Sequence, residues 1–127
     1  MADALTPVTL DEVDITAELS RRPHRQPDYR EENRALVQLA QEMATNPKNI
    51  LQKLVEIAFT LCRADTAGIS LLETHHGEAV FRWEALAGVY APHRNNTMPR
   101  DASPCGTTID RNATDTRYLH DLPWHRE

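Results

Sequence analysis

The sequence predicts an α+β fold in which two helices precede an antiparallel sheet. Apolar residues recur at helical spacing through residues 28–45 and 46–61, and the period then changes to the alternation of extended strands. A length of 127 residues and a mass of 14.4 kDa allow one domain with a single modest core. We therefore expect one domain over residues 28–127, preceded by a flexible arm over residues 1–27.

The composition of residues 1–27 is typical of a flexible segment without long regular structure. Pro7, Pro23 and Pro27 interrupt any long regular element, and arginine and acidic residues are frequent between them. Thr9 and Glu12 form the pattern of a capping box. This pattern favours either one short helix that docks on a partner chain or a solvated tail.

The first long helix is predicted to begin at Asp28. This residue follows Pro27 and precedes Glu31 by three positions, which is the pattern of a capped helix start. The helical spacing of apolar residues continues to about Thr45. The expected apolar face consists of Leu36, Leu39, Ala40 and Met43.

Asn46 and Pro47 predict the start of a second helix, because proline in the first helical position loses no hydrogen bond. Its apolar stripe is wide enough to face two neighbours. The stripe consists of Ile50, Leu51, Leu54, Val55, Ile57, Ala58 and Leu61. One side is expected to cover the sheet. The other side either pairs with a second subunit, which predicts a homodimer through the N-terminal helices, or is buried within its own chain.

Two strands are predicted over residues 67–73 and 79–87, with a turn between them. Strict alternation places Phe81, Trp83 and Ala85 on one face of the second strand, opposite Val80, Arg82, Glu84 and Leu86. One of these faces should be core. Residues 91–98 are polar and irregular, and residues 116–120 predict a short further strand.

Charge and composition exclude several classes of function. The net charge of −5 argues against a nucleic-acid surface, since Arg21, Arg22 and Arg25 are the longest basic cluster. No apolar run approaches the roughly eighteen residues that span a bilayer, so we expect no membrane partner and a cytoplasmic location. Two cysteines are too few for a disulfide framework, and the six histidines lack the spacing of a zinc site.

The segment over residues 99–110 places one thiol between a proline and a glycine. Ser103 is suited to cap backbone N–H groups, and Gly106 allows the backbone to approach a neighbour closely. A helix that begins near Ser103 would direct its unpaired N–H groups at Cys105, which favours a thiolate or an anionic ligand. The simpler alternative is a small buried side chain that only packs.

The order of these elements resembles the front half of a GAF domain. The resemblance covers about residues 28–112 and rests on Ala67-Gly68-Ile69-Ser70-Leu71-Leu72, on Phe81-Arg82-Trp83, and on the segment from Pro99 through Cys105-Gly106 to Arg111. It is similar to the GAF modules of bacterial histidine kinases and related two-component signalling proteins. The resemblance implies a sheet with helices on one side and a ligand pocket on the other. Members of this family bind different cofactors or none, so the cofactor stays unassigned.

A GAF domain continues through further apolar strands, and residues up to Glu127 do not supply them. We therefore expect a truncated sheet whose C-terminal strands are missing. Its unpaired edge favours marginal stability, dimerisation or aggregation. The kinase half is also absent, so no phosphotransfer is expected.

The chain also resembles the free methionine-R-sulfoxide reductases, which are GAF-fold enzymes. Pro104-Cys105-Gly106-Thr107 and Asp121-Leu122-Pro123-Trp124-His125 are similar to their motifs in order and rough spacing. This chemistry needs a second thiol to resolve the sulfenic acid. No cysteine follows Cys105, and Cys62 serves only if its helix faces the same pocket. An enzyme is therefore the alternative to the main expectation.

We expect a sensory or regulatory module that binds a small molecule or mediates dimerisation, and that has no catalytic residue or metal ligand. Arg100 is available for an anionic group, and Trp83 for a flat one. The residues expected to line the pocket are Trp83, Arg100, Asp101, Ser103, Cys105 and Thr107.

Overall fold

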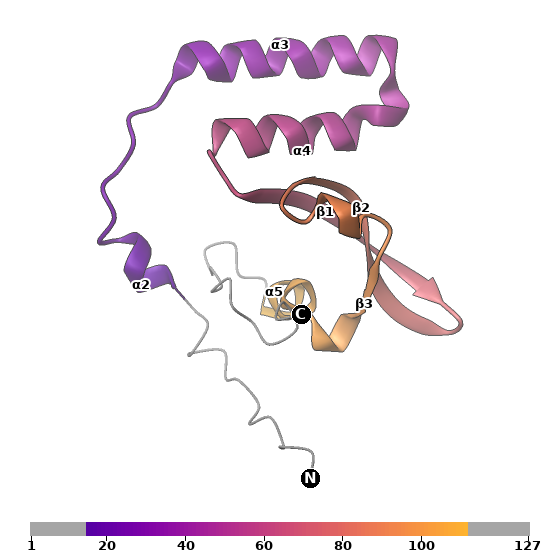
Figure 1. Cartoon of the computed structure of the whole chain (residues 1–127). Coiled ribbons are helices and arrows are strands. Elements are labelled where there is room, and N and C mark those ends of the chain that lie inside the picture. Colours follow the sequence, from indigo (N-terminus) through magenta and orange to yellow (C-terminus); the bar gives the residue numbers. More distant parts are fainter. Residues whose placement is uncertain (1–14, 112–127) are drawn as a thin grey trace. The chain divides into compact units, whose positions relative to one another are not determined.

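The computed structural model describes residues 15–111 (Figure 1). Residues Gln26–Gly106 form one compact unit, and Met1–Arg25 with Thr107–Glu127 form a second. The described part of the second unit contains the short helix α2 (Thr16–Leu19). The capping box at Thr9 and Glu12 and the strand expected over residues 116–120 lie outside the described residues.

Helices α3 (Tyr29–Thr45) and α4 (Ile50–Leu61) form a helical hairpin, joined by the 3-10 turn η1 (Pro47–Asn49) (Figure 1). The predicted start of α3 is confirmed, because the Asp28 carboxylate accepts a hydrogen bond from the Glu31 backbone N–H at 3.1 Å. At the other end the Asn49 side chain donates to the Glu42 carboxylate at 3.0 Å. This bond joins α3 to the turn that leads into α4.

The predicted apolar face of α3 is only partly right, because Leu39 is half-buried but Ala40 is exposed. The one buried residue on this helix is Ala35, whereas Leu36 and Met43 are exposed. The side chain of Ala35 is small, so α4 packs closely against it, and longer polar side chains such as Gln38 border the contact. Leu36 and Met43, roughly a quarter of a turn away around the helix, are left on the outer surface.

The apolar stripe of α4 meets two neighbours, as its width predicts. Val55 and Ile57 are buried, and Ile57 lies with Ala35 of α3 along the line where the two helices meet. The second neighbour is therefore α3 of the same chain. α4 forms the layer between α3 and the sheet (Figure 1).

The sheet has three antiparallel strands in the order β1 (Thr66–His75), β2 (Glu78–Gly88) and β3 (Thr97–Pro99). This confirms the α+β class at the level of helices and an antiparallel sheet. His76 and Gly77 connect β1 to β2 with φ values of 52° and 80°, which is the left-handed conformation of a two-residue hairpin turn.

A β-bulge changes which residues share a face of β2. Ile69 pairs with Ala85 but Ser70 pairs with Trp83, so Glu84 is an extra residue. Strict alternation therefore gave the wrong faces at this point. Trp83 lies on the same face as Leu86, because a Cβ atom at Gly68 would lie within 3.0 Å of both side chains.

The core lies between α4 and the other face of the sheet. Val55 packs against Ala85 and Ala87 of β2, and partly buried side chains surround this contact. These are Leu51, Phe59, Ala67 and Ile69. We call the face of the sheet that carries Ala85 and Ala87 the helix face, and the face that carries Gly68, Ser70 and Trp83 the open face.

Side chains and loops complete the second edge of β2 beyond the short strand β3. The Gln52 amide donates to the Leu86 carbonyl at 3.0 Å and accepts from the Leu86 N–H at 3.3 Å. The Trp83 N–H donates to the backbone carbonyl of Asn96 at 3.0 Å, and the Trp83 carbonyl accepts from the backbone N–H of Asn95 at 2.8 Å. Gln52 thus replaces a neighbouring strand. The outer edge of β1 has no strand partner within residues 15–111.

In the part of the chain that the structure describes, no helix combines the length and the apolar character that crossing a bilayer requires.

We predict that Gly88→Ala destabilises the protein by about 2–3 kcal/mol, more than Gly77→Ala. Both glycines have positive φ, at 87° and 80°, but a Cβ atom at Gly88 would overlap the Asp65 carbonyl, whereas nothing lies within 4 Å of one at Gly77. Urea unfolding of both variants measures the difference. Equal losses of stability would contradict the close approach at Gly88.

We predict that Gln52→Ala lowers the free energy of unfolding by about 1–3 kcal/mol, because the N–H and C=O of Leu86 lose their partners. Gln41→Ala is the matched control, since Gln41 is exposed on α3. Its expected change is within about 0.5 kcal/mol. Similar midpoints for the two variants in thermal unfolding would show that Gln52 does not stabilise the edge.

Candidate functional site

The segment after β3 crosses back over the open face of the sheet. It contains the 3-10 turn η3 (Arg100–Ala102), which lies against β2, and the start of α5 (Pro104–Arg111). Ser70 of β1 donates a hydrogen bond to the Cys105 sulfur at 3.4 Å. The structure therefore places the thiol beside the sheet, opposite to the face that α4 covers.

Ser103 and Gly106 hold this turn in place. Ser103 is buried, and its hydroxyl donates to the Arg100 carbonyl and accepts from the Gly106 N–H, each at 3.1 Å. A Cβ atom at position 106 would overlap the Arg100 carbonyl. The expected cap and the expected close approach are both confirmed. Ser103 thus orders the backbone around Cys105, and its place in a ligand pocket stays a prediction.

Trp83 supplies the aromatic surface of the open face. Its indole lies over Gly68, where a Cβ atom would be only 3.0 Å from the ring, and it is the register partner of Ser70. The side chain is half-buried. A flat aromatic ring, a hydroxyl and a thiol therefore occupy the open face together, on three different elements of the chain.

Arg100 and Asp101 form an ion pair at 3.2 Å at the border of this face. The Asp101 carboxylate is almost fully exposed, so water competes for it and the pair is weak. Thr107 lies in α5, and its side chain is outside the described part of the structure.

The two cysteines lie at different parts of the fold. Cys62 is exposed and caps the C-terminal end of α4, which packs on the helix face, whereas Cys105 contacts the open face. The condition that Cys62 shares a pocket with Cys105 is therefore not met. This arrangement does not supply the resolving thiol that a sulfoxide reductase needs.

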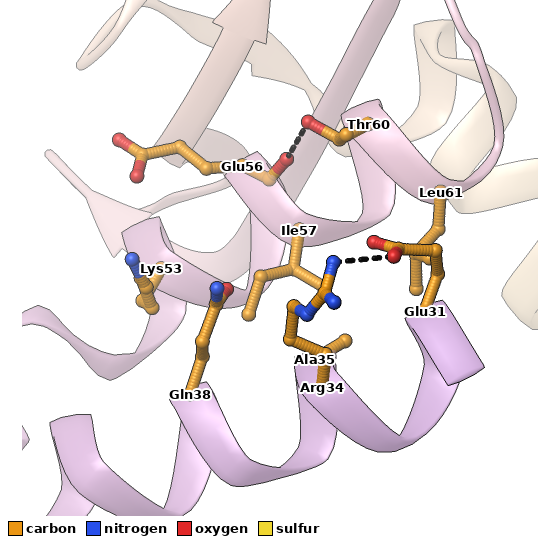
Figure 2. Close-up of a pocket in the computed structure, with 9 residues that line it drawn as sticks. All are labelled: Glu31, Arg34, Ala35, Gln38, Lys53, Glu56, Ile57, Thr60 and Leu61. Atoms are coloured by element: carbon orange, nitrogen blue, oxygen red, sulfur yellow. Dashed lines mark hydrogen bonds and ion pairs between the residues drawn. The ribbon is translucent and has the colours of Figure 1, made fainter.

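A cleft of about 280 Å³ lies between α3 and α4, away from all six predicted residues (Figure 2). Ala35 and Ile57 form its floor, and four charged residues of balanced sign stand around it. These are Glu31, Arg34, Lys53 and Glu56. Arg34 is already paired with Glu31, and Thr60 donates to the Glu56 carbonyl at 3.1 Å (Figure 2). The cleft does not select a ligand by charge. The feature of the sequence that indicates this cleft is a small residue, Ala35, on the helix that packs against the wide apolar stripe of α4.

A second polar cluster lies on the hairpin. Arg82 of β2 pairs with Glu73 of β1 at 2.7 Å and with Glu84, the extra residue of the bulge. The hydrogen bonds from Arg82 hold the pKa of the Glu73 carboxyl below its ordinary value, and the two carboxylates raise the pKa of Arg82. No pattern in the sequence indicates this cluster, because its members are brought together by the register of β1 on β2 and by the bulge at Glu84. One guanidinium bridges two carboxylates and ties β1 to β2, which indicates a structural role.

Among residues 15–111, no three or more histidine, cysteine, aspartate or glutamate side chains are placed to hold a metal ion. Comparison of the chain with protein-family models, with curated proteins and with solved structures finds no match. The structure therefore defines the chain as an α+β protein with a three-stranded antiparallel sheet. Its resemblance to GAF domains stays a prediction from the sequence.

We predict that the stabilising effect of Glu73 depends on pH. Because the folded-state pKa is lowered, its contribution is present above the ordinary carboxyl pKa of about 4.3 and is lost as the pH falls through the folded value. Glu73→Gln should be less stable than the wild type at pH 7, and the two should converge in acid. Urea unfolding between neutral pH and about pH 3 measures this, with Glu78→Gln as an exposed control on the same hairpin. A constant difference across that range would contradict the ion pair.

Proposed function

We propose that this chain is a cytoplasmic sensory or regulatory module of the GAF type, which binds a small molecule on the open face of its sheet. The observation that carries the proposal is the contact between Cys105 and Ser70, which holds the start of α5 over the sheet beside Trp83. Helix α4 covers the other face. This is the division that the resemblance to GAF domains implies.

The side chains on this face indicate the chemistry of the ligand. The half-buried indole of Trp83 offers a surface on which a flat ring can stack. The Ser70 hydroxyl and the Cys105 thiol offer weak polar contacts beside it. Arg100 provides a guanidinium, and one of its partners, the Asp101 carboxylate, is exposed to water. A planar heterocycle that carries an anionic group fits these properties.

The surroundings of Cys105 favour binding over catalysis. Within the described residues its hydrogen-bond partner is the Ser70 hydroxyl, and a serine hydroxyl does not act as the base that activates a thiol. The free methionine-R-sulfoxide reductase remains the alternative, and it is separable by experiment because it requires turnover.

We predict that a cyclic nucleotide, as a flat and anionic probe, shifts the amide resonances of Ser70, Trp83 and Cys105 in a saturable way. Trp83→Ala should weaken this binding at least about tenfold, a loss of about 1.4 kcal/mol, because the stacking surface is removed. Cys105→Ser should change it by less than about threefold, since serine preserves the polar contact.

Lys53→Ala, in the cleft between α3 and α4, is the control and should bind like the wild type. Shifts that map to this cleft, or no saturable shift with nucleotides or haem, would contradict the proposed face. Turnover of free methionine sulfoxide with a thiol reductant, lost in Cys105→Ser, would instead establish the enzyme.

A further inference from the structure

An apolar stripe runs along the outer surface of α3, on the side that α4 does not cover. Tyr29, Leu36 and Met43 follow one another at intervals of seven residues, so they lie in one row along the helix. They are 70%, 64% and 64% exposed. The stripe is completed by Val37, Ala40 and Ala44. We call these six residues the outer stripe.

The outer stripe lies on a stretch of helix that is almost free of charge. From Ala35 to Thr45 the charged residue is Glu42, and its side chain is turned to the other side, where it bonds Asn49. Surfaces of monomeric proteins seldom leave large apolar side chains in such a row. Depletion of charge together with exposed Tyr, Leu and Met is typical of the centre of a protein–protein interface.

The outer stripe is complementary in shape to the outer stripe of a second copy that runs in the opposite direction. If two copies of α3 cross in antiparallel orientation at Ala40, the small Ala40 side chains meet and allow close approach. Each Leu36 then lies opposite the other copy's Ala44, and each Val37 opposite the other copy's Met43. Large residues face small ones or flexible methionine, which is the complementarity that a two-fold interface requires.

The charges at the two ends of the stripe favour the same orientation. Glu32 lies about 12 Å before Ala40 along the helix, and the exposed Lys48 follows α3 at a similar separation in sequence. An antiparallel pair therefore brings Glu32 of one copy to the end of α3 after which the turn η1 carries Lys48 of the other. A parallel pair would instead bring the two Glu32 side chains together, which is repulsive.

We infer that the outer stripe of α3 is the interface of a homodimer, in which two copies of α3 cross antiparallel at Ala40. One helix face buries less than the roughly 800 Å² per partner of a standard interface, so the dimer is reversible, with a dissociation constant on the order of micromolar. The inference does not depend on the proposed ligand site, which lies on the open face of the sheet.

Sedimentation velocity of the whole chain over concentrations from about 5 to about 500 µM tests the dimer across the expected dissociation constant. Leu36→Glu and Met43→Glu should each raise the dissociation constant at least about tenfold, with an unchanged circular dichroism spectrum because both residues are already exposed. Leu72→Glu is the matched control, since Leu72 is a similarly exposed leucine on the sheet. It should dimerise like the wild type.

A charge exchange tests the orientation. Glu32→Lys and Lys48→Glu should each weaken the dimer, and the double variant should restore it, because only the antiparallel pair brings Glu32 to the end of α3 that Lys48 follows. A monomer at every concentration would overturn the inference and would point to another occupant of the stripe, such as a segment of the same chain. A dimer lost in Leu72→Glu but kept in Leu36→Glu would overturn it in favour of association through the sheet. Failure of the double variant to restore the dimer would overturn the antiparallel crossing.

Discussion

The packing of Val55 on Ala85 and Ala87 is the contact on which the rest of the described structure depends. Val55 is 2% exposed and Ala85 0%, so the centre of the core is one helical side chain against two small strand side chains. A twelve-residue helix is marginal alone in water, and this sheet, whose third strand has only 3 residues, is little more than a marginal hairpin. The alanines let α4 approach the sheet closely, and α4 in turn presents Ile57 to α3. Loss of this contact would leave each layer without a partner.

The β-bulge at Glu84 links this core to the candidate site. The extra residue turns Ala85 and Ala87 to the helix face while Trp83 and Phe81 stay on the open face. Without the bulge, the indole and the core alanines would compete for the same side of the sheet. The carboxylate of Glu84 is used as well, because it pairs with Arg82 beside the bulge. One inserted residue therefore separates the face of the sheet that packs on α4 from the face that carries Trp83.

Short sequence patterns predicted where helices and strands lie. They did not predict which faces of these elements are buried, because contacts between distant parts of the chain determine that. The capping pattern at Asp28 located the start of α3, because the chemistry of a helix end is contained within a few residues. Pro47 begins the 3-10 turn η1 instead, and α4 starts three residues later at Ile50. The cap at Ser103 and the close approach at Gly106 were predictable for the same reason. The faces of β2 were not, since a bulge leaves no mark in alternation. The apolar residues of α3 gave the wrong contact, because α4 packs on the small Ala35 and leaves Leu36 outside.

Native-state hydrogen exchange, read residue by residue, tests most directly whether the contact of α4 with the sheet organises the structure. The account predicts that the slowest amides belong to α4 around Val55 and to β2 around Ala85, and that they open together with the free energy of global unfolding. The outer helix α3 should exchange faster. If α3 or the tip of the hairpin near Gly77 held the slowest amides while those around Val55 exchanged quickly, the core would lie elsewhere and the account would be contradicted.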